Sequence, residues 1–282
     1  MAWKAHHNNF KGVITSKEAE TLRRAYGQIA YSKHVTTKEN WKQATYSTIW
    51  WEVQKRLLSK LKFNDRTRIT KFVNQILPSN SKLHQQDKQH PSKCPSCNES
   101  ETNNHISACN NPRRAKLRNN MLRTLRKIME KTATHIQAQE IILQGIKAAI
   151  THGIEIVDNN QLSFQPSGII WSALQEQNAI GWTNFYKGRM SKKWEQVQQQ
   201  HYNQTKPKEA DTHRWATSII STLWQGLLLM WEDRNDDQHG RDTIESAAKE
   251  WDILLNKIHQ LYTQKESIDP EDRRLYHKPE EQ

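Results

Sequence analysis

The stretch from residue 94 to residue 109 reads CPSCNESETNNHISAC and contains every cysteine of the 282-residue chain. Its pattern, C-x2-C-x7-H-x3-C, singles out four candidate metal ligands: Cys94, Cys97, His105 and Cys109. Two thiolates separated by two residues hold one side of a tetrahedral ion from a single tight turn. A histidine and a cysteine four residues apart share one face of a helix. The spacing therefore predicts a Cys3His zinc site.

Two other interpretations of this stretch stay open: free thiols clustered by chance, and iron–sulfur ligation, which suits a histidine at this spacing less well. His84 and His90 lie nearby, but the ligand set is complete without them. A closed set leaves no coordination position for a substrate, which argues against zinc catalysis. Zinc binding by such a set contributes on the order of 10–16 kcal/mol in apparent terms. We therefore expect residues 80–115 to lose their fold without metal.

Three clustered cysteines do not form a disulfide framework, so they favour a reducing compartment, the nucleus or the cytoplasm. The first ten residues contain no apolar run, and the most apolar stretch, residues 216–231, is interrupted by polar residues. We therefore expect an intracellular protein with no signal peptide and no membrane partner.

A positive charge excess indicates the kind of partner. Lys and Arg total 42 against 30 Asp and Glu, a formal net charge of +12. Such an excess favours polyanions, with nucleic acid as the first candidate and an anionic membrane as the second. A positive surface that binds nothing is the alternative.

The segment directly after the cysteine stretch, residues 112–152, is basic and helical in pattern. Asn111 suits an N-cap and Pro112 the first helical position, while Met121, Leu125 and Met129 recur on one helical face. We expect the cations to contact phosphates of RNA or DNA without sequence preference, the first four most closely. They are Arg113, Arg114, Lys116, Arg118, Arg123, Arg126 and Lys127.

Glycine and proline are scarce, nine and eight residues, which predicts a mainly α-helical fold with at most a short β-hairpin near 154–164. We expect one long helical stretch over about 170–203 and two helices over about 211–266 that meet near Gly240. Five segments are predicted: a helical lead-in (1–77), the zinc-binding knuckle (78–111), the basic helical segment (112–152), a tryptophan-rich helical region (153–266) and a disordered tail (267–282). The seven tryptophans after residue 153 are expected in the core.

Motifs for catalysis are missing from the sequence. No glycine-rich phosphate loop, no nucleophile elbow and no pair of aspartates in a strand–turn–strand context suited to two-metal chemistry is found. Asp236 and Asp237 fall in a charged helical segment and are expected at the surface. The sequence therefore predicts that the chain by itself is not an enzyme.

Several motifs resemble the zinc-binding region downstream of reverse transcriptase in non-LTR retrotransposons. They are Ile76-Leu77-Pro78-Ser79-Asn80, Leu83-His84, Cys94-Pro95-Ser96-Cys97-Asn98-Glu99 and His105-Ile106-Ser107-Ala108-Cys109. Three later segments resemble the region that follows this knuckle in retroelement-derived proteins: Ile180-Gly181-Trp182, the run 188–194, and 228–235 with its Trp-x2-Arg-Asn sequence, followed by His239-Gly240.

This resemblance implies that the four ligands hold zinc, and that a reverse transcriptase domain is a partner in cis or in trans. The polymerase residues of the family lie in an upstream domain that has no counterpart here. The chain therefore resembles a C-terminal fragment of such a polyprotein, or a stand-alone protein derived from one. Two other functions stay open: a helical interaction scaffold that docks on a polymerase partner, and an inactive retroelement remnant.

Overall fold

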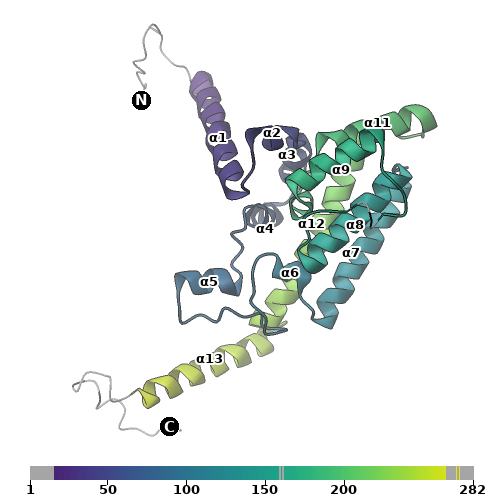
Figure 1. Cartoon of the computed structure of the whole chain (residues 1–282). Coiled ribbons are helices and arrows are strands. Elements are labelled where there is room, and N and C mark those ends of the chain that lie inside the picture. Colours follow the sequence, from purple (N-terminus) through teal and green to yellow (C-terminus); the bar gives the residue numbers. More distant parts are fainter. Residues whose placement is uncertain (1–15, 159, 161, 265–270, 272, 274–282) are drawn as a thin grey trace, which may run out of the picture. The chain divides into compact units, whose positions relative to one another are not determined.

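Figure 1 shows the computed structural model of the chain, which describes residues 16–158, 160, 162–264, 271 and 273. Within these residues the backbone forms thirteen helices and no β-sheet, which confirms the mainly α-helical prediction. Two isolated antiparallel bridges, Ile49 with Ser191 and Lys93 with Ser100, are the β-type pairings of the described chain.

The helices vary from one turn to 28 residues. In the first half of the chain they are α1 (Ser16–Lys38), α2 (Gln43–Thr48), α3 (Trp51–Lys60), α4 (Phe63–Val73), α5 (Asn80–Gln86), α6 (His105–Ala108) and α7 (Pro112–Lys131). In the second half they are α8 (Ile136–His152), α9 (Gly168–Ile180), α10 (Trp182–Tyr186), α11 (Lys192–Thr205), α12 (Thr212–His239) and α13 (Thr243–Thr263).

Two helices do meet at Gly240, as predicted. Gly240 has a φ of +94°, which lets the chain leave α12 in a left-handed conformation that a side chain would disfavour. Asp242 then caps α13, because its carboxylate accepts hydrogen bonds from the backbone N–H groups of Ile244 and Glu245, both at 2.9 Å.

The helical stretch predicted over about 170–203 is helical but not continuous, because the chain breaks there into α9, α10 and α11. Gly181 and Gly188 adopt φ values of +92° and +85° at the two breaks. The side chain of Gln177 fixes the bend: its amide nitrogen donates to the Gly181 carbonyl (3.2 Å), and its amide oxygen accepts from the Ser191 N–H (2.9 Å). A buried glutamine thus replaces helical hydrogen bonds.

The described residues of 154–164 form no β-strand. The backbone N–H of Val157 donates to the side-chain oxygen of Asn178 (3.0 Å), and the Val157 carbonyl accepts from the amide nitrogen of Asn178 (3.1 Å). One side-chain amide therefore satisfies the groups that a partner strand would have bonded.

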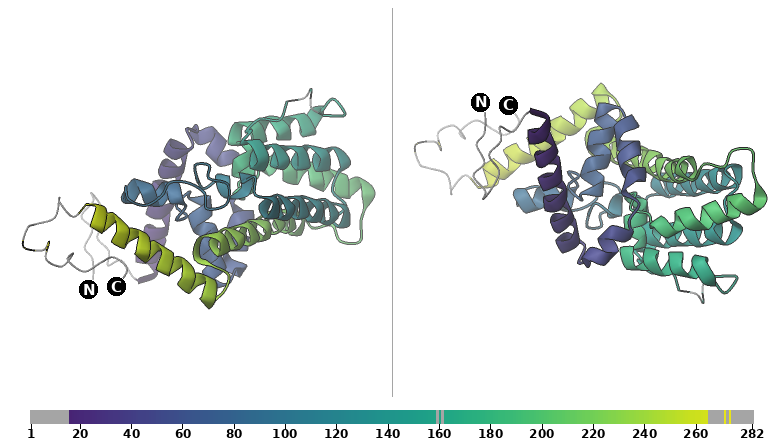
Figure 2. Two further views of the ribbon diagram at one scale, coloured as in Figure 1. Left: turned by 90° about the horizontal axis from the view of Figure 1, so that it is seen from below. Right: turned by 90° about the horizontal axis from the view of Figure 1, so that it is seen from above.

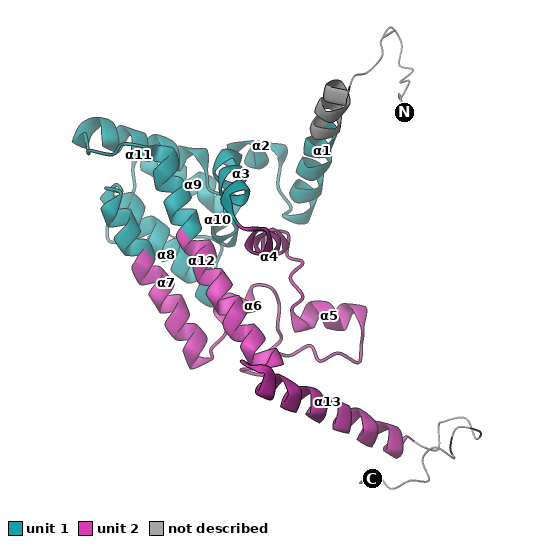
Figure 3. Ribbon diagram, turned by 180° about the vertical axis from the view of Figure 1, so that it is seen from behind, with its two compact units in different colours: residues 1–61, 125–221 teal, residues 62–124, 222–282 magenta. Residues whose placement is uncertain are grey.

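The chain divides into two compact units, each built from two stretches (Figure 3). Unit 1 comprises residues 1–61 and 125–221, and unit 2 comprises residues 62–124 and 222–282. In unit 1, α9 packs against α11, and α10 packs against α8 (Figure 2). The five predicted consecutive segments stay a prediction. The predicted tail, 267–282, lies outside the described residues apart from 271 and 273.

Most of the later tryptophans lie in the core, as expected. The buried ones are Trp182, Trp194, Trp215, Trp224 and Trp231. In unit 1 the ring of Trp182 stacks on Phe185 with centroids 5.4 Å apart and lies 6.5 Å from that of Trp194. The expectation is wrong for Trp171 and Trp251, which are 37% and 60% exposed. Within the described chain, no helix is both long enough and apolar enough to cross a membrane.

Candidate metal centre

A tight turn presents the first two ligands. The Cys94 N–H donates to the Glu99 carbonyl (2.7 Å), and the Asn98 N–H donates back to the Cys94 carbonyl (3.0 Å). The bridge between Lys93 and Ser100 closes the turn. Asn98 has a φ of +62°, a left-handed conformation that asparagine tolerates better than most residues. The Cys-x2-Cys spacing therefore folds as the sequence predicts.

The short helix α6 presents the other two ligands. The Cys109 N–H donates to the His105 carbonyl (2.7 Å), so one helical turn separates the histidine from the cysteine. Between them, Ile106 is completely buried and anchors the turn in the interior of unit 2.

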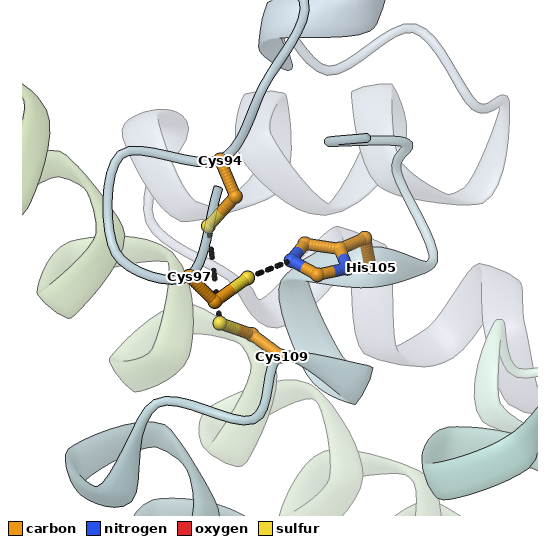
Figure 4. A group of neighbouring side chains, drawn as sticks. All are labelled: Cys94, Cys97, His105 and Cys109. Atoms are coloured by element: carbon orange, nitrogen blue, oxygen red, sulfur yellow. Dashed lines mark hydrogen bonds between the residues drawn. The ribbon is translucent and has the colours of Figure 1, made fainter. Parts of the chain in front are cut away.

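The four ligand atoms converge on one point (Figure 4). They all lie within 4.8 Å of one another. The sulfurs of Cys94 and Cys109 are 3.8 Å apart, and Nε2 of His105 lies 3.2 Å from the sulfur of Cys97. In a tetrahedral site with metal–sulfur bonds near 2.3 Å, the sulfur–sulfur edge is about 3.8 Å. The group is therefore close enough to hold a metal ion and has dimensions compatible with zinc.

The pKa values of the thiols depend on one another through electrostatic interactions. Burial raises the pKa of Cys94, but hydrogen bonds from His105, from the N–H groups of Ser96 and Cys97 and from Arg114 outweigh it and lower this pKa to about 5. Burial and the negative charge on Cys94 raise the pKa of Cys109 to about 12. One thiolate thus opposes formation of the next, and a bound divalent cation is the natural compensation for all three.

His105 is oriented from both sides of its ring. Its Nε2 faces the sulfurs, while Nδ1 lies 3.6 Å from a carboxylate oxygen of Glu99. A carboxylate behind a ligating imidazole favours a proton on the far nitrogen and leaves the near one free to bind metal. Glu99 is therefore a supporting residue of the candidate centre.

Arg114 lies beside the ligands and is fully buried. Its guanidinium donates to the Cys94 sulfur (3.5 Å) and to the hydroxyl of Ser96 (2.6 Å). It also forms ion pairs with Asp233 (3.4 Å) and Asp237 (3.2 Å) of α12. The expectation that Arg114 contacts phosphates is wrong for this structure, because its charge is already used inside the protein.

Asp237 is an anchor rather than a surface residue. It accepts hydrogen bonds from Ser96 and from Arg113, and its side chain is only 15% exposed. Burial raises its pKa, but these two hydrogen bonds and the charges of Arg113 and Arg114 bring the pKa below its usual value. The predicted surface position for Asp237 is therefore corrected: it ties the candidate centre to α12.

Arg118 is also directed inward. It is 8% exposed and donates to the carbonyls of Ser107 (2.7 Å) and Cys109 (3.1 Å). The helical period explains this, since positions 114, 118, 121, 125 and 129 share one face of α7, and all five are buried. The positions of Met121, Leu125 and Met129 in the sequence could therefore have predicted that Arg114 and Arg118 lie on the buried face of α7.

The other predicted phosphate contacts remain at the surface. Lys116, Arg123, Arg126 and Lys127 are exposed. Arg113 is 40% exposed at its side chain and is paired with Asp233 and Asp237. Four of the seven predicted cations are therefore available to a ligand.

A second buried ion pair holds the far side of the stretch. Arg234 of α12 grips Glu101 with two hydrogen bonds, of 2.6 and 3.0 Å, and both side chains are almost fully buried. Glu101 also accepts from the Asn80 N–H (2.7 Å), and Asn80 accepts from Arg234 (2.7 Å). The sequence analysis did not assign this pair, although Arg234 belongs to the Trp-x2-Arg-Asn sequence.

Comparison of the chain with protein-family models, with curated proteins and with solved structures finds no match. The geometry of the candidate centre and its surroundings therefore carries the functional argument.

Proposed function

We propose that Cys94, Cys97, His105 and Cys109 bind one zinc ion. The observation that supports this site is the convergence of three sulfurs and one imidazole nitrogen within 4.8 Å of one another, with the Cys94 and Cys109 sulfurs 3.8 Å apart, as in a tetrahedral zinc site. Thiolate-rich sets of this kind select zinc or iron–sulfur clusters, and a Cys3His set is a usual structural zinc arrangement.

Metal analysis of the purified chain tests this site. One equivalent of zinc is expected, and His105→Ala should lose most of it. The matched control is His90→Ala, because His90 lies close in sequence but outside the ligand group. A chain with no stoichiometric metal, or equal losses in the two variants, contradicts the proposal.

We propose further that the chain is a non-catalytic module that binds RNA or DNA through phosphates along α7. Lys116, Arg123 and Lys127 follow one another at intervals of seven and four residues, so they share one exposed face, with Arg126 beside them. Eleven residues of helix cover about 16 Å. Phosphates on one strand recur about every 3.4 Å along a duplex, so this face matches a short run of the backbone.

The metal centre supports this surface by fixing the start of α7. The Asn111 N–H donates to the sulfur of Cys109 (3.5 Å), and the Asn111 side chain caps Arg113 (2.9 Å). Arg118 ties the helix back to the carbonyl of Cys109. Metal binding and the position of the basic helix are therefore coupled, and we expect chelation to weaken nucleic-acid binding.

A salt titration on single- and double-stranded probes tests the surface. The quadruple variant Lys116→Gln, Arg123→Gln, Arg126→Gln, Lys127→Gln should bind weakly and show a flatter dependence on salt, by about 3 in the slope of log K against log salt. The control variant Lys55→Gln, Arg56→Gln, Lys60→Gln, Lys62→Gln removes the same charge from exposed positions on and after α3. If both variants show the same slope of log K against log salt, the proposal that α7 forms the phosphate-binding surface is wrong.

We propose an origin in the C-terminal region of a retrotransposon reverse transcriptase, with the polymerase domain as partner in cis or in trans. The support is the resemblance of the Cys-Pro-x-Cys knuckle and of the Trp-x2-Arg-Asn sequence. The chain alone should not extend a primer on a template when nucleotides are supplied, although it should still bind the nucleic-acid probes. Primer extension by the purified chain would contradict the proposal that it is non-catalytic.

A further inference from the structure

Helix α13 carries an exposed apolar face. None of its residues is buried, and Gly240, with a φ of +94°, separates it from α12. Its large apolar side chains are strongly exposed: Ile244 (80%), Trp251 (60%), Ile253 (51%), Leu254 (45%), Leu255 (44%) and Leu261 (47%). A soluble surface seldom presents so many large apolar groups on one short helix unless a partner covers them.

Four of these residues, Ile244, Trp251, Leu254 and Leu261, have the spacing of a coiled coil, whereas Ile253 and Leu255 lie beside that seam. Ile244, Trp251 and Ile258 recur every seven residues, and Ala247, Leu254 and Leu261 follow each of them by three. This alternation of three and four defines the a and d positions of three heptads, which form a narrow seam along one side of the helix.

The opposite side of α13 contacts the end of α12. Lys249 occupies the f position, directly across the helix from the seam, and its ammonium donates to the carbonyls of Asp236 (3.1 Å) and Asp237 (2.7 Å) at the end of α12. The helix is thus held by its polar side, and the seam faces away from that attachment.

We propose that α13 pairs with α13 of a second copy of this chain as an antiparallel coiled coil. One register fills all the seam positions, because each a residue then faces a d residue of the other copy. Ile244 packs on the partner's Leu261, Ala247 on the partner's Ile258, and Trp251 on the partner's Leu254. The two-fold symmetry repeats each contact, as a closed dimer requires.

Charge at the seam's edge selects the antiparallel orientation. The g positions hold Glu250 and Lys257. In an antiparallel pair g residues flank g residues, so this register sets Glu250 beside the partner's Lys257, twice in the dimer. A parallel pair would instead set Glu250 beside the partner's Leu255 and force Trp251 against its own copy. The sequence of α13 is therefore complementary to itself in one direction only.

Sedimentation of the full, metal-loaded chain without nucleic acid tests this inference, so its outcome is independent of the proposed nucleic-acid binding. The mass should rise from 33.2 kDa toward twice that value across about two decades of micromolar concentration. A helix of three heptads forms a weak dimer, so a concentration-dependent equilibrium is expected rather than a permanent pair. A monomer throughout this range overturns the proposal.

Charge reversal provides the sharper test. Glu250→Lys and Lys257→Glu, each alone, bring like charges together and should weaken the dimer about tenfold or more. Equal mixtures of the two variants should recover association, because opposite charges then face each other at both edges. Asp252→Lys is the matched control, an exposed position on the outer side of α13 whose reversal should change little.

Two results would refute the antiparallel register. In the first, the reversals at 250 and 257 weaken the dimer no more than Asp252→Lys. In the second, the mixture associates no better than either variant alone. Circular dichroism of each variant excludes loss of helix as the cause, since all three positions are exposed.

Discussion

The stretch from Lys93 to Cys109 and the core of unit 1 are stabilised in different ways. The stretch contributes few large apolar side chains and is surrounded by buried charges, whereas unit 1 encloses Trp182, Trp194 and Trp215 at 1% exposure or less. Burying one such ring, on the order of 150–250 Å², contributes roughly 4–6 kcal/mol. The comparison teaches that one region is stabilised by buried apolar area, whereas the other combines buried ion pairs with a group of four candidate metal ligands.

The conformational entropy of the backbone shows why the two regions should depend on different interactions. Ordering one residue costs about 1–2 kcal/mol, so a stretch of this length needs a large compensation that Ile106 alone cannot supply. A bound zinc ion contributes on the order of 10–16 kcal/mol in apparent terms. The two regions should therefore respond in opposite ways to metal removal and to core substitution.

Chelation should have the largest effect. Removing the metal is expected to abolish amide protection over residues 93–109 while α8, α9 and α10 of unit 1 stay protected, because the latter depend on apolar packing. Hydrogen exchange with and without chelator measures both regions at once. Uniform loss of protection, or none at all, would contradict the distinction drawn between them.

Removal of the buried carboxylate of Glu101 should have the second-largest effect. Glu101→Ala leaves the charge of Arg234 buried without its partner and should destabilise unit 2 by about 3–5 kcal/mol in chemical denaturation. Glu232→Ala is the control, because Glu232 is 54% exposed at its side chain and its ion pair with Arg68 lies at the surface of the same unit. The double variant Glu101→Leu with Arg234→Met should cost less than Glu101→Ala; a larger cost would show that the pair contributes beyond mutual charge compensation.

A methyl group added at Gly145 tests the apolar region. A Cβ at Gly145 would overlap the buried indole of Trp182, so Gly145→Ala should destabilise unit 1 by about 1–3 kcal/mol despite alanine's higher helix propensity. Gly27→Ala is the matched control, because nothing lies within 4 Å of its added Cβ. It should be neutral or stabilising by up to about 1 kcal/mol. Zinc content should stay unchanged in both variants.

The smallest expected effect is a pH dependence caused by Lys187, in which the stability of unit 1 increases as the pH rises. Burial lowers the pKa of Lys187 from its usual 10.5 to about 8, although Glu39 opposes the shift. Between these values the unfolded chain binds more protons than the folded one, so stability rises with pH. From pH 7.5 to 9.5 we expect unit 1 to gain about 1–2 kcal/mol.

Denaturation of Lys187→Met at both pH values checks this origin. The alkaline gain should disappear in that variant, whereas Lys193→Met, at a more exposed lysine, should retain it. A gain of equal size in both variants would assign the pH dependence to other groups.

Local spacing in the sequence predicted the four candidate metal ligands and the mainly α-helical fold. The four ligands fall within sixteen consecutive residues, so a tight turn and one helical turn suffice to bring them together. The helix break at Gly240 was equally local, because one left-handed residue and an N-cap define it. Such features depend on neighbours in the chain, and a pattern can predict them.

Tertiary structure decided which partners the inward-facing charges meet. The helical period separates Arg114, on the buried face of α7, from the exposed Lys116, but it does not say which acidic group compensates the buried charge. The partner of Arg114, Asp237, lies 123 positions further along the chain, and Glu101 meets Arg234 across 133 positions. No local sequence pattern can predict pairs that are separated by more than a hundred positions along the chain. The energy of a buried charge depends on a partner that only the folded chain brings into place.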